Sequence, residues 1–200
     1  MDKQKAAADI IAAALPLIPF DGWNQQTLAK AAQDAGYKRT DVIRVFSGGA
    51  IDAVDTFLRN ADAQMAEDMK SYYLEKMKIR ERIATAVRIR ISLHNQHREA
   101  LRKAMAMQAL PLYAMHALKT LYATVDAIWY AIGDTSTDFN FYTKRLTLAG
   151  VYMSTLLFWL DDKTPGFEAS WEFLDRRIGD VMQIEKAKSK LKSWFERRTA

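Results

Sequence analysis

The sequence contains no cysteine, only four prolines and only eight glycines in 200 residues. Without cysteine, the chain can form no disulfide, thiolate metal site or cysteine nucleophile. A glycine-rich phosphate loop and the Glu-x-x-His spacing of helical di-iron sites are also missing. His94 and His97 lie three residues apart, but they lack the carboxylate partners that such a metal site needs. No Ser-His-Asp or paired-carboxylate arrangement can be argued from the sequence. The sequence therefore offers no candidate for a metal ligand or a catalytic residue, and we expect no metal and no cofactor.

Long apolar runs are missing as well. The longest uncharged stretch, Leu146 to Leu160, is shorter than the roughly 20 residues of a membrane-spanning helix. Asp9 interrupts the apolar part of the N-terminal stretch, which therefore resembles an amphipathic helix and not a secretory signal. The chain is 50% hydrophobic and 11% aromatic, enough for a sizeable core. These features predict a soluble protein of one domain, or of one domain with a small appendage.

Positive charge is concentrated in the middle and at the end of the chain. The formal net charge is +5. Residues 76–103 carry +7, from nine Lys or Arg and two Glu, and residues 185–200 carry +4. Residues 1–60 sum to zero. We interpret the central basic stretch as a solvated face, with binding of nucleic acid or anionic lipid as the alternatives.

Apolar residues recur at three- and four-residue spacing along most of the chain, without the alternation of strands. The chain is therefore predicted to be all-α. Proline and glycine clusters divide the pattern into separate helices. The expected ranges are 3–17, 24–35, 40–46, 50–72, 76–93, 96–108, 111–132, 139–161 and 167–184, followed by a separate short helix over 184–198.

Residues 23–58, "WNQQTLAKAAQDAGYKRTDVIRVFSGGAIDAVDTFL", resemble the helix-turn-helix of the TetR repressor family in their spacing. Gly36 is expected at the tight turn, because glycine accepts a positive φ. Val42 and Phe46 are the expected core anchors of the helix that follows. The resemblance implies a TetR-repressor-like helical bundle, in which the last long helices form a homodimer and the middle helices enclose a ligand cavity.

The sequence gives little support for DNA binding by this motif. Asp41 lies at the N-terminal end of the expected recognition helix, where it would repel phosphate. Ile43 and Gly49 stand where TetR-type repressors usually carry a phosphate-contacting Tyr and a Lys. The zero net charge of residues 1–60 offers little counterion-release affinity. Three basic residues remain that could bind DNA weakly: Lys38, Arg39 and Arg44. We favour a degenerate motif retained for structure.

A second resemblance is carried by "GDTSTDFNFYTKRLTLAGVYMSTLLFWLDDKTPGFEASWEFLDRR". An acidic turn is followed by D-x-N-[FWY]-Y-T-[KR]-R, an apolar helix, D-x-[ST]-P-x-F and W-x-F-L-x-x-R. This pattern resembles the ubiquinone (coenzyme Q) biosynthesis accessory family, lipid-binding proteins with a TetR-like fold. The matching residues are Asp138, Asn140, Phe141, Tyr142, Thr143, Lys144, Arg145, Asp162, Thr164, Pro165, Phe167, Trp171, Phe173, Leu174 and Arg177.

The resemblance implies a carrier and not an enzyme. Members of this family bind an isoprenoid lipid and dock the di-iron hydroxylase of ubiquinone synthesis, to which they are thought to present a quinone precursor. Phe141, Tyr142 and Arg145 would then bind the hydroxylase, and aromatic and Arg side chains are enriched at such interfaces. Phe141 stands where animal relatives tend to have Trp, so the contact would differ in detail. The alternative is that Phe139 and Tyr142 fix the helix start to the core.

A bound isoprenoid or phospholipid needs a large, mostly apolar cavity. Methionine and aromatic side chains between residues 105 and 159 could provide adaptable walls. Each of them could instead be an ordinary core residue. The candidates are Met105, Leu110, Tyr113, Tyr122, Trp129, Tyr152, Met153, Leu156 and Trp159.

The last residues have the composition of a membrane-surface helix. At helical spacing, the apolar residues of 184–198 share one face that is flanked by lysines and arginines, a pattern typical of interfacial membrane helices. The alternative is that this helix packs back onto the fold or frays. The expected membrane-contact residues are Lys190, Leu191, Lys192, Trp194 and Phe195.

These expectations divide the chain into a degenerate helix-turn-helix region (1–60), a helical lipid-binding and dimerisation domain (61–184) and an amphipathic membrane-contact helix (185–200). The expected function is presentation of an isoprenoid quinone precursor to a membrane-associated di-iron hydroxylase. The expected location is the cytoplasmic face of a bacterial inner membrane, or the mitochondrial matrix side for a processed eukaryotic protein. The alternatives are a TetR-type transcription repressor with a hydrophobic effector and an assembly factor that carries no lipid.

Overall fold

The computed structural model describes residues 2–134 and 139–199, without the side chains of 139–140 and 184–199. Within these ranges the chain forms helices and no strand, which confirms the all-α prediction. The α-helices are α1 (Lys3–Ala14), α2 (Ile18–Asp21), α3 (Gln25–Asp34), α4 (Arg39–Val45), α5 (Ala50–Met69), α6 (Ile79–Ser92), α7 (Arg98–Gln108), α8 (Ala114–Ala131), α9 (Phe139–Asp161) and α10 (Glu168–Thr199). One-turn 3-10 helices lie at Leu74–Lys76, Asn95–His97, Pro111–Tyr113 and Pro165–Phe167.

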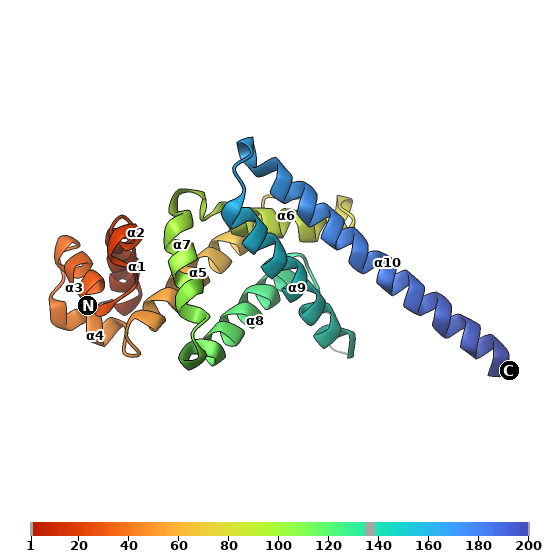
Figure 1. Cartoon of the computed structure of the whole chain (residues 1–200), viewed down its shortest axis with the longest axis horizontal. Coiled ribbons are helices and arrows are strands. Elements are labelled where there is room, and N and C mark those ends of the chain that lie inside the picture. Colours follow the sequence, from red (N-terminus) through yellow and green to blue (C-terminus); the bar gives the residue numbers. More distant parts are fainter. Residues whose placement is uncertain (1, 135–138, 200) are drawn as a thin grey trace.

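The N-terminal helices α1, α3 and α4 pack together at one end of the molecule (Figure 1). Asn24 begins α3, because its side-chain oxygen accepts hydrogen bonds from the backbone N–H groups of Gln26 and Thr27, both at 2.9 Å. Gly36 has a φ of 81° and turns the chain between α3 and α4. The predicted pair of helices around Gly36 is therefore present, with Val42 and Phe46 buried as expected.

The larger part of the molecule is built on α5, which packs along α8 and also contacts α6 and α7. Trp23 joins the two parts, since its indole N–H donates to the carbonyl oxygen of Ala100 on α7 at 2.9 Å. The same ring lies 5.4 Å from that of Phe57 on α5. Helix α5 runs unbroken through the boundary expected near residue 60.

Helices α9 and α10 meet at a turn organised by Asp162, which is buried. One carboxylate oxygen accepts from the Thr164 backbone N–H at 2.8 Å and from its hydroxyl at 2.7 Å. The other accepts from the Ser170 backbone N–H at 2.9 Å and from its hydroxyl at 2.5 Å. Asp162 thus supplies an acceptor for the Ser170 N–H in the first turn of α10.

The expectation of a separate helix over 184–198 is wrong, because α10 continues from Glu168 to Thr199. No proline lies in this range, and the lone Gly179 is tolerated within the helix. In Figure 1, α10 extends away from the other helices and carries the C-terminus to the opposite end from the N-terminus. The one-turn helix α2, placed between Pro16 and Gly22, was not predicted.

Candidate functional site

A pocket of about 510 Å³ opens between α7, α8 and α9. Three alanines, Ala106, Ala109 and Ala117, leave the space that larger side chains would fill. The wall is mainly leucine and methionine, which suits an apolar ligand. The other lining residues are Leu58, Arg90, Leu101, Arg102, Met105, Gln108, Leu118, Thr120, Leu121, Thr124, Tyr152, Met153, Leu156, Leu157 and Leu160.

One end of this pocket is buried and polar. Arg90 on α6, Thr124 on α8 and Tyr152 on α9 line it, and they are 1%, 2% and 4% exposed. The Arg90 Nε donates to Asp62 Oδ1 at 2.6 Å, and the Thr124 hydroxyl donates to Asp62 Oδ2 at 3.1 Å. Arg90 also donates to the Leu58 carbonyl oxygen at 2.9 Å. A charged pair therefore lies beneath an apolar wall, and each partner neutralises the other.

His94 belongs to the same buried cluster. Its Nε2 lies 2.5 Å from Arg90 Nη1, and because a guanidinium can only donate, Nε2 is the acceptor and Nδ1 carries the hydrogen. Burial lowers the pKa of His94 well below its ordinary value, and the charge of Arg90 lowers it further, so the ring is neutral. The Nδ1 hydrogen has no hydrogen-bond partner among the described residues.

The pKa values of two groups in the cluster are raised. Burial raises the pKa of Asp62, although the charge of Arg90 and the bonds from Arg90 and Thr124 act in the opposite direction. Burial also raises the pKa of Tyr152, so its hydroxyl keeps its proton. That hydroxyl makes no hydrogen bond to any described residue.

The opposite end of the pocket is exposed and apolar. Leu118 and Leu157 line the pocket and are 60% and 54% exposed. Other exposed apolar side chains precede and follow Leu118 in the chain, from the turn after α7 into α8. They are Leu110, Leu112, Met115 and Tyr122. The pocket thus runs from a buried polar end to an exposed rim that is mainly apolar and also includes Arg102.

Four of the nine residues predicted to enclose a lipid line this pocket: Met105, Tyr152, Met153 and Leu156. The other five lie elsewhere. Leu110 and Tyr122 are exposed, Tyr113 is half-buried against His116, and Trp159 is fully buried beneath Arg98. Trp129 lines a second, smaller pocket.

The smaller pocket, of about 270 Å³, lies between α6, α8, α9 and α10. It is also mainly apolar, and Lys144 in its wall pairs with Asp134 at 2.7 Å. Its lining residues are Ile79, Arg80, Ile83, Trp129, Thr143, Lys144, Thr147, Leu148, Val151, Ile178, Val181 and Met182.

The residues predicted to bind a hydroxylase divide into an exposed and a buried part. Tyr142 is 68% exposed, whereas Arg145 is 4% exposed. Arg145 pairs with Asp126 at 2.6 Å and with Asp134 at 3.6 Å. Phe141 is half-buried and packs edge-to-face on Tyr142, with ring centroids 5.2 Å apart. Arg145 therefore supports the aromatic pair from below and is not part of the exposed surface.

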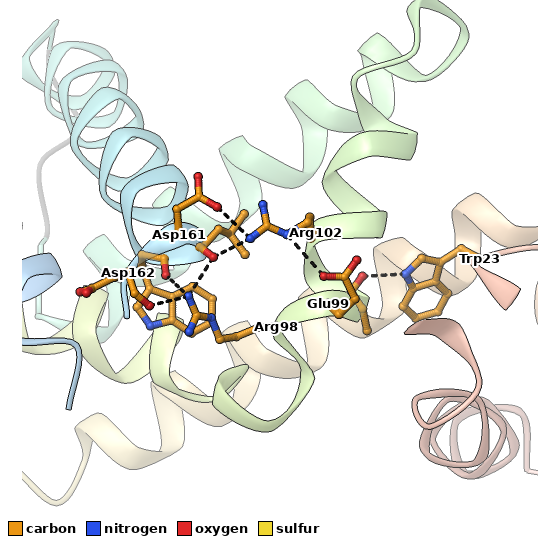
Figure 2. Close-up of polar contacts among 9 residues, drawn as sticks. Trp23, Arg98, Glu99, Arg102, Asp161 and Asp162 are labelled. Atoms are coloured by element: carbon orange, nitrogen blue, oxygen red, sulfur yellow. Dashed lines mark hydrogen bonds and ion pairs between the residues drawn. The ribbon is translucent and has the colours of Figure 1, made fainter. Parts of the chain in front are cut away.

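Helix α7 holds the C-terminal end of α9 next to the large pocket. The Arg98 Nη2 lies 2.6, 2.8 and 2.9 Å from the carbonyl oxygens of Trp159, Leu160 and Asp162. Arg102 adds a bond to the Leu160 carbonyl oxygen at 2.6 Å (Figure 2). The last carbonyls of a helix lack the usual partners four residues on, and of these three only the Trp159 carbonyl gains a bond from a described backbone N–H, that of Asp162 at 3.2 Å. The two guanidinium groups therefore complete the end of α9.

Several predicted residues lie outside the described part of the structure. Asp138 is not described, and only the backbone is described for Asn140 and for the expected membrane-contact residues of α10. Those membrane-contact residues are Lys190, Leu191, Lys192, Trp194 and Phe195. Within the described ranges, no helix combines the length and apolarity needed to cross a membrane. The described His, Asp and Glu side chains also form no group of three or more that could hold a metal ion.

The COQ9 family model matches residues 114–185, which span α8, α9 and the start of α10. The "Ubiquinone biosynthesis protein COQ9, mitochondrial" of Rattus norvegicus is 32% identical over 194 residues, covering 94% of this chain and 62% of that protein. The chain is similar to the COQ9 family.

Other COQ9 proteins match similarly. That of Xenopus tropicalis is 33% identical over 182 residues, covering 88% of this chain and 57% of its own length. The Homo sapiens protein is 30% identical over 194 residues, with 94% and 61% covered. The chain thus spans about three fifths of the length of these relatives.

The fold is that of TetR regulators, as predicted. A TetR transcriptional regulator from Nitrosomonas europaea superposes with a TM-score of 0.72 and 17% identity, over 88% of this chain and 98% of that one. At this identity the likeness shows the fold alone.

Proposed function

We propose that this protein is a lipid-binding accessory protein of ubiquinone biosynthesis. It would bind an isoprenoid quinone precursor and present it to a membrane-associated di-iron hydroxylase, without itself catalysing a reaction. The observation that carries this proposal is the pocket of about 510 Å³, whose wall is mainly apolar and whose rim is exposed. The names of the COQ9 relatives, all ubiquinone biosynthesis proteins, support the pathway.

The surface of α9 supports docking of an enzyme. Tyr142 presents an exposed ring next to Phe141, and the arginine beneath them keeps both in place. Aromatic residues held in one orientation lose little entropy when a partner binds. Further along α9, the exposed side chains of Leu146 and Phe158 support a homodimer through α9 and α10.

Membrane association is the remaining part of the proposal. The basic, apolar composition of residues 185–200 suits the surface of an anionic bilayer. The matched COQ9 relatives are named mitochondrial, which supports the matrix side of the inner membrane for a eukaryotic protein. In a bacterium, the equivalent place is the cytoplasmic face of the inner membrane.

Lipid extraction followed by mass spectrometry tests the carrier function. We expect the purified protein to yield a co-purified isoprenoid in a near-stoichiometric amount. Ala117→Phe, which places a ring in the pocket, should lower the yield at least fivefold, whereas Ala114→Phe on the exposed face of α8 should not. An empty wild-type protein would favour the assembly factor that carries no lipid.

A TetR-type repressor with a hydrophobic effector is the second candidate, because the fold is that of a TetR regulator. The α4 surface argues against it. Ile43 is 62% exposed, and the Asp41 carboxylate accepts from the Lys38 backbone N–H at 3.0 Å, which fixes its negative charge at the start of α4. Selection from a random DNA pool decides between them: enrichment of one sequence motif would support the repressor.

A further inference from the structure

The buried end of the large pocket offers unused hydrogen-bonding groups. Arg90 has five N–H groups, and three of them bond to Asp62, His94 and the Leu58 carbonyl, so two remain. The Tyr152 hydroxyl lines the same end and bonds to no described residue. Both side chains line the pocket, so this arrangement favours an occupant that accepts hydrogen bonds from them.

The charge of this end selects the kind of occupant. Asp62 balances Arg90, and His94 is neutral, so no uncompensated positive charge faces the pocket. A phosphate headgroup would have to leave water without a counter-charge, which is strongly unfavourable. A neutral oxygen, such as a quinone carbonyl or a phenol, needs only hydrogen bonds.

The available groups match such an oxygen. Arg90 and Tyr152 can donate to it, whereas Thr124 already donates its hydrogen to Asp62 and can only accept. The exposed fractions of the lining residues indicate how the ligand is oriented. The exposed fraction rises from 4% or less at Arg90 and Tyr152 to more than half at Leu118, so the oxygen would lie deep and the apolar part at the rim.

We propose that the buried end of this pocket binds the neutral oxygenated ring of a prenylated phenol or quinone, with Arg90 and Tyr152 as donors. The apolar tail leaves past Leu118 and Leu157. This inference rests on the proposed carrier function and adds to it the orientation of the ligand and a preference for a neutral ring over a phosphate.

Binding of three amphiphiles with the same tail tests the inference. Delipidated protein is equilibrated with a decyl-substituted benzoquinone, with decylbenzene or with decyl phosphate, and bound ligand is quantified by mass spectrometry after rapid desalting. We expect the quinone to bind about tenfold more tightly than decylbenzene, and decyl phosphate to bind most weakly.

The variant Tyr152→Phe removes one donor and keeps the ring. It should weaken quinone binding about fivefold and leave decylbenzene binding unchanged. Its melting temperature should equal or exceed that of the wild-type protein, because the lost hydroxyl had no partner. Tyr130 is exposed and lies outside this pocket. Tyr130→Phe is therefore the matched control and should change the binding of neither ligand.

The outcomes separate this inference from the proposed function. Equal binding of all three amphiphiles, or an equal loss of quinone and decylbenzene in Tyr152→Phe, would overturn the ring site and leave the carrier intact. Tightest binding of decyl phosphate would also overturn the ring site and leave the carrier intact. If the wild-type protein binds none of them, both proposals fail.

Discussion

The guanidinium carbon of Arg145 lies 3.3 Å from the centre of the Phe141 ring. Phe141 precedes Arg145 by about one helical turn on α9. The same guanidinium pairs with Asp126 and Asp134 and is almost completely buried. Arg145 therefore determines where Phe141 lies, and through the edge-to-face contact it also orients Tyr142. An enzyme that docks on this corner would touch the aromatic rings, while the arginine holds them from within.

We predict that Arg145→Ala destabilises the protein by about 3 kcal/mol, because two carboxylates lose a buried partner. Tyr142→Ala should change stability by less than about 0.5 kcal/mol, since its ring is mostly exposed. Urea unfolding measures both. Both variants should lose co-purification with the hydroxylase, but only Tyr142→Ala should do so at full stability. Wild-type stability of Arg145→Ala would show that the ion pairs contribute nothing.

Much of this helix arrangement follows from the sequence. The range 139–161 was predicted for α9 and is observed, because a turn with Gly133 precedes it and a Pro-Gly pair follows it. The change in composition near residue 184 predicts a break where α10 is continuous. Residues 180–199 contain no glycine or proline, so the helix continues through this change.

The polar end of the pocket could not be predicted in the same way. Asp62 and Arg90 are 28 residues apart on different helices, and Thr124 is 62 residues from Asp62. Helical spacing shows which residues share a face of one helix but not which helices meet. One signal is present: Arg90 follows Ala86 by four residues and Val87 by three, so helical spacing places it on their apolar face of α6. An arginine on such a face indicates a buried partner elsewhere in the chain.

Asp162 should make stability depend on pH. Burial alone would raise its pKa, but hydrogen bonds from Ser170 and Thr164 outweigh burial and lower the pKa to about 2. Because the folded-state pKa lies below the unfolded value of about 3.9, the carboxylate stabilises the fold above pH 4. This contribution disappears as the pH falls from about 4 towards 2.

We predict that Asp162→Asn lowers the free energy of unfolding by about 2 kcal/mol at pH 7. The difference from the wild-type protein should shrink as the pH falls below 4, which urea titrations between pH 7 and 3 can follow. Asp161→Asn is the matched control, because its side chain is 80% exposed and should contribute less than about 0.5 kcal/mol. A constant difference across this pH range would contradict the role of the carboxylate charge.

Even the replacement of Arg98 by lysine should destabilise the protein. Its guanidinium stacks on Trp159 and Phe167, with 4.8 and 4.9 Å to the ring centroids, while it bonds to the carbonyls that end α9. Arg98→Ala should cost about 2 kcal/mol, and Arg98→Lys should recover less than half of that, since an ammonium cannot stack in the same way. Arg102→Ala, on a more exposed side chain, should cost less, and thermal unfolding gives the order of the three.

Deletion of residues 185–200 should weaken membrane binding. It removes a charge of +4 together with Trp194 and Phe195. Each cation near an anionic surface contributes about 1 kcal/mol. Sedimentation with vesicles containing anionic lipid should fall about tenfold or more, with a smaller change for neutral vesicles. Equal vesicle binding by the full chain and by the chain without residues 185–200 would assign membrane contact to another surface.

The Asp62–Arg90 pair permits a double-mutant test of how the polar end of the pocket is held. Asp62→Leu alone leaves the Arg90 charge buried without a counter-charge, so the free energy of unfolding should fall by about 4 kcal/mol. Adding Arg90→Met removes that charge, and a hydrophobic pair is tolerated where a single buried charge is not, so the double variant should regain at least about 2 kcal/mol. Urea unfolding of the four proteins gives the coupling between the two residues. A double variant whose loss equals the sum of the two single losses would mean that the pair is not coupled.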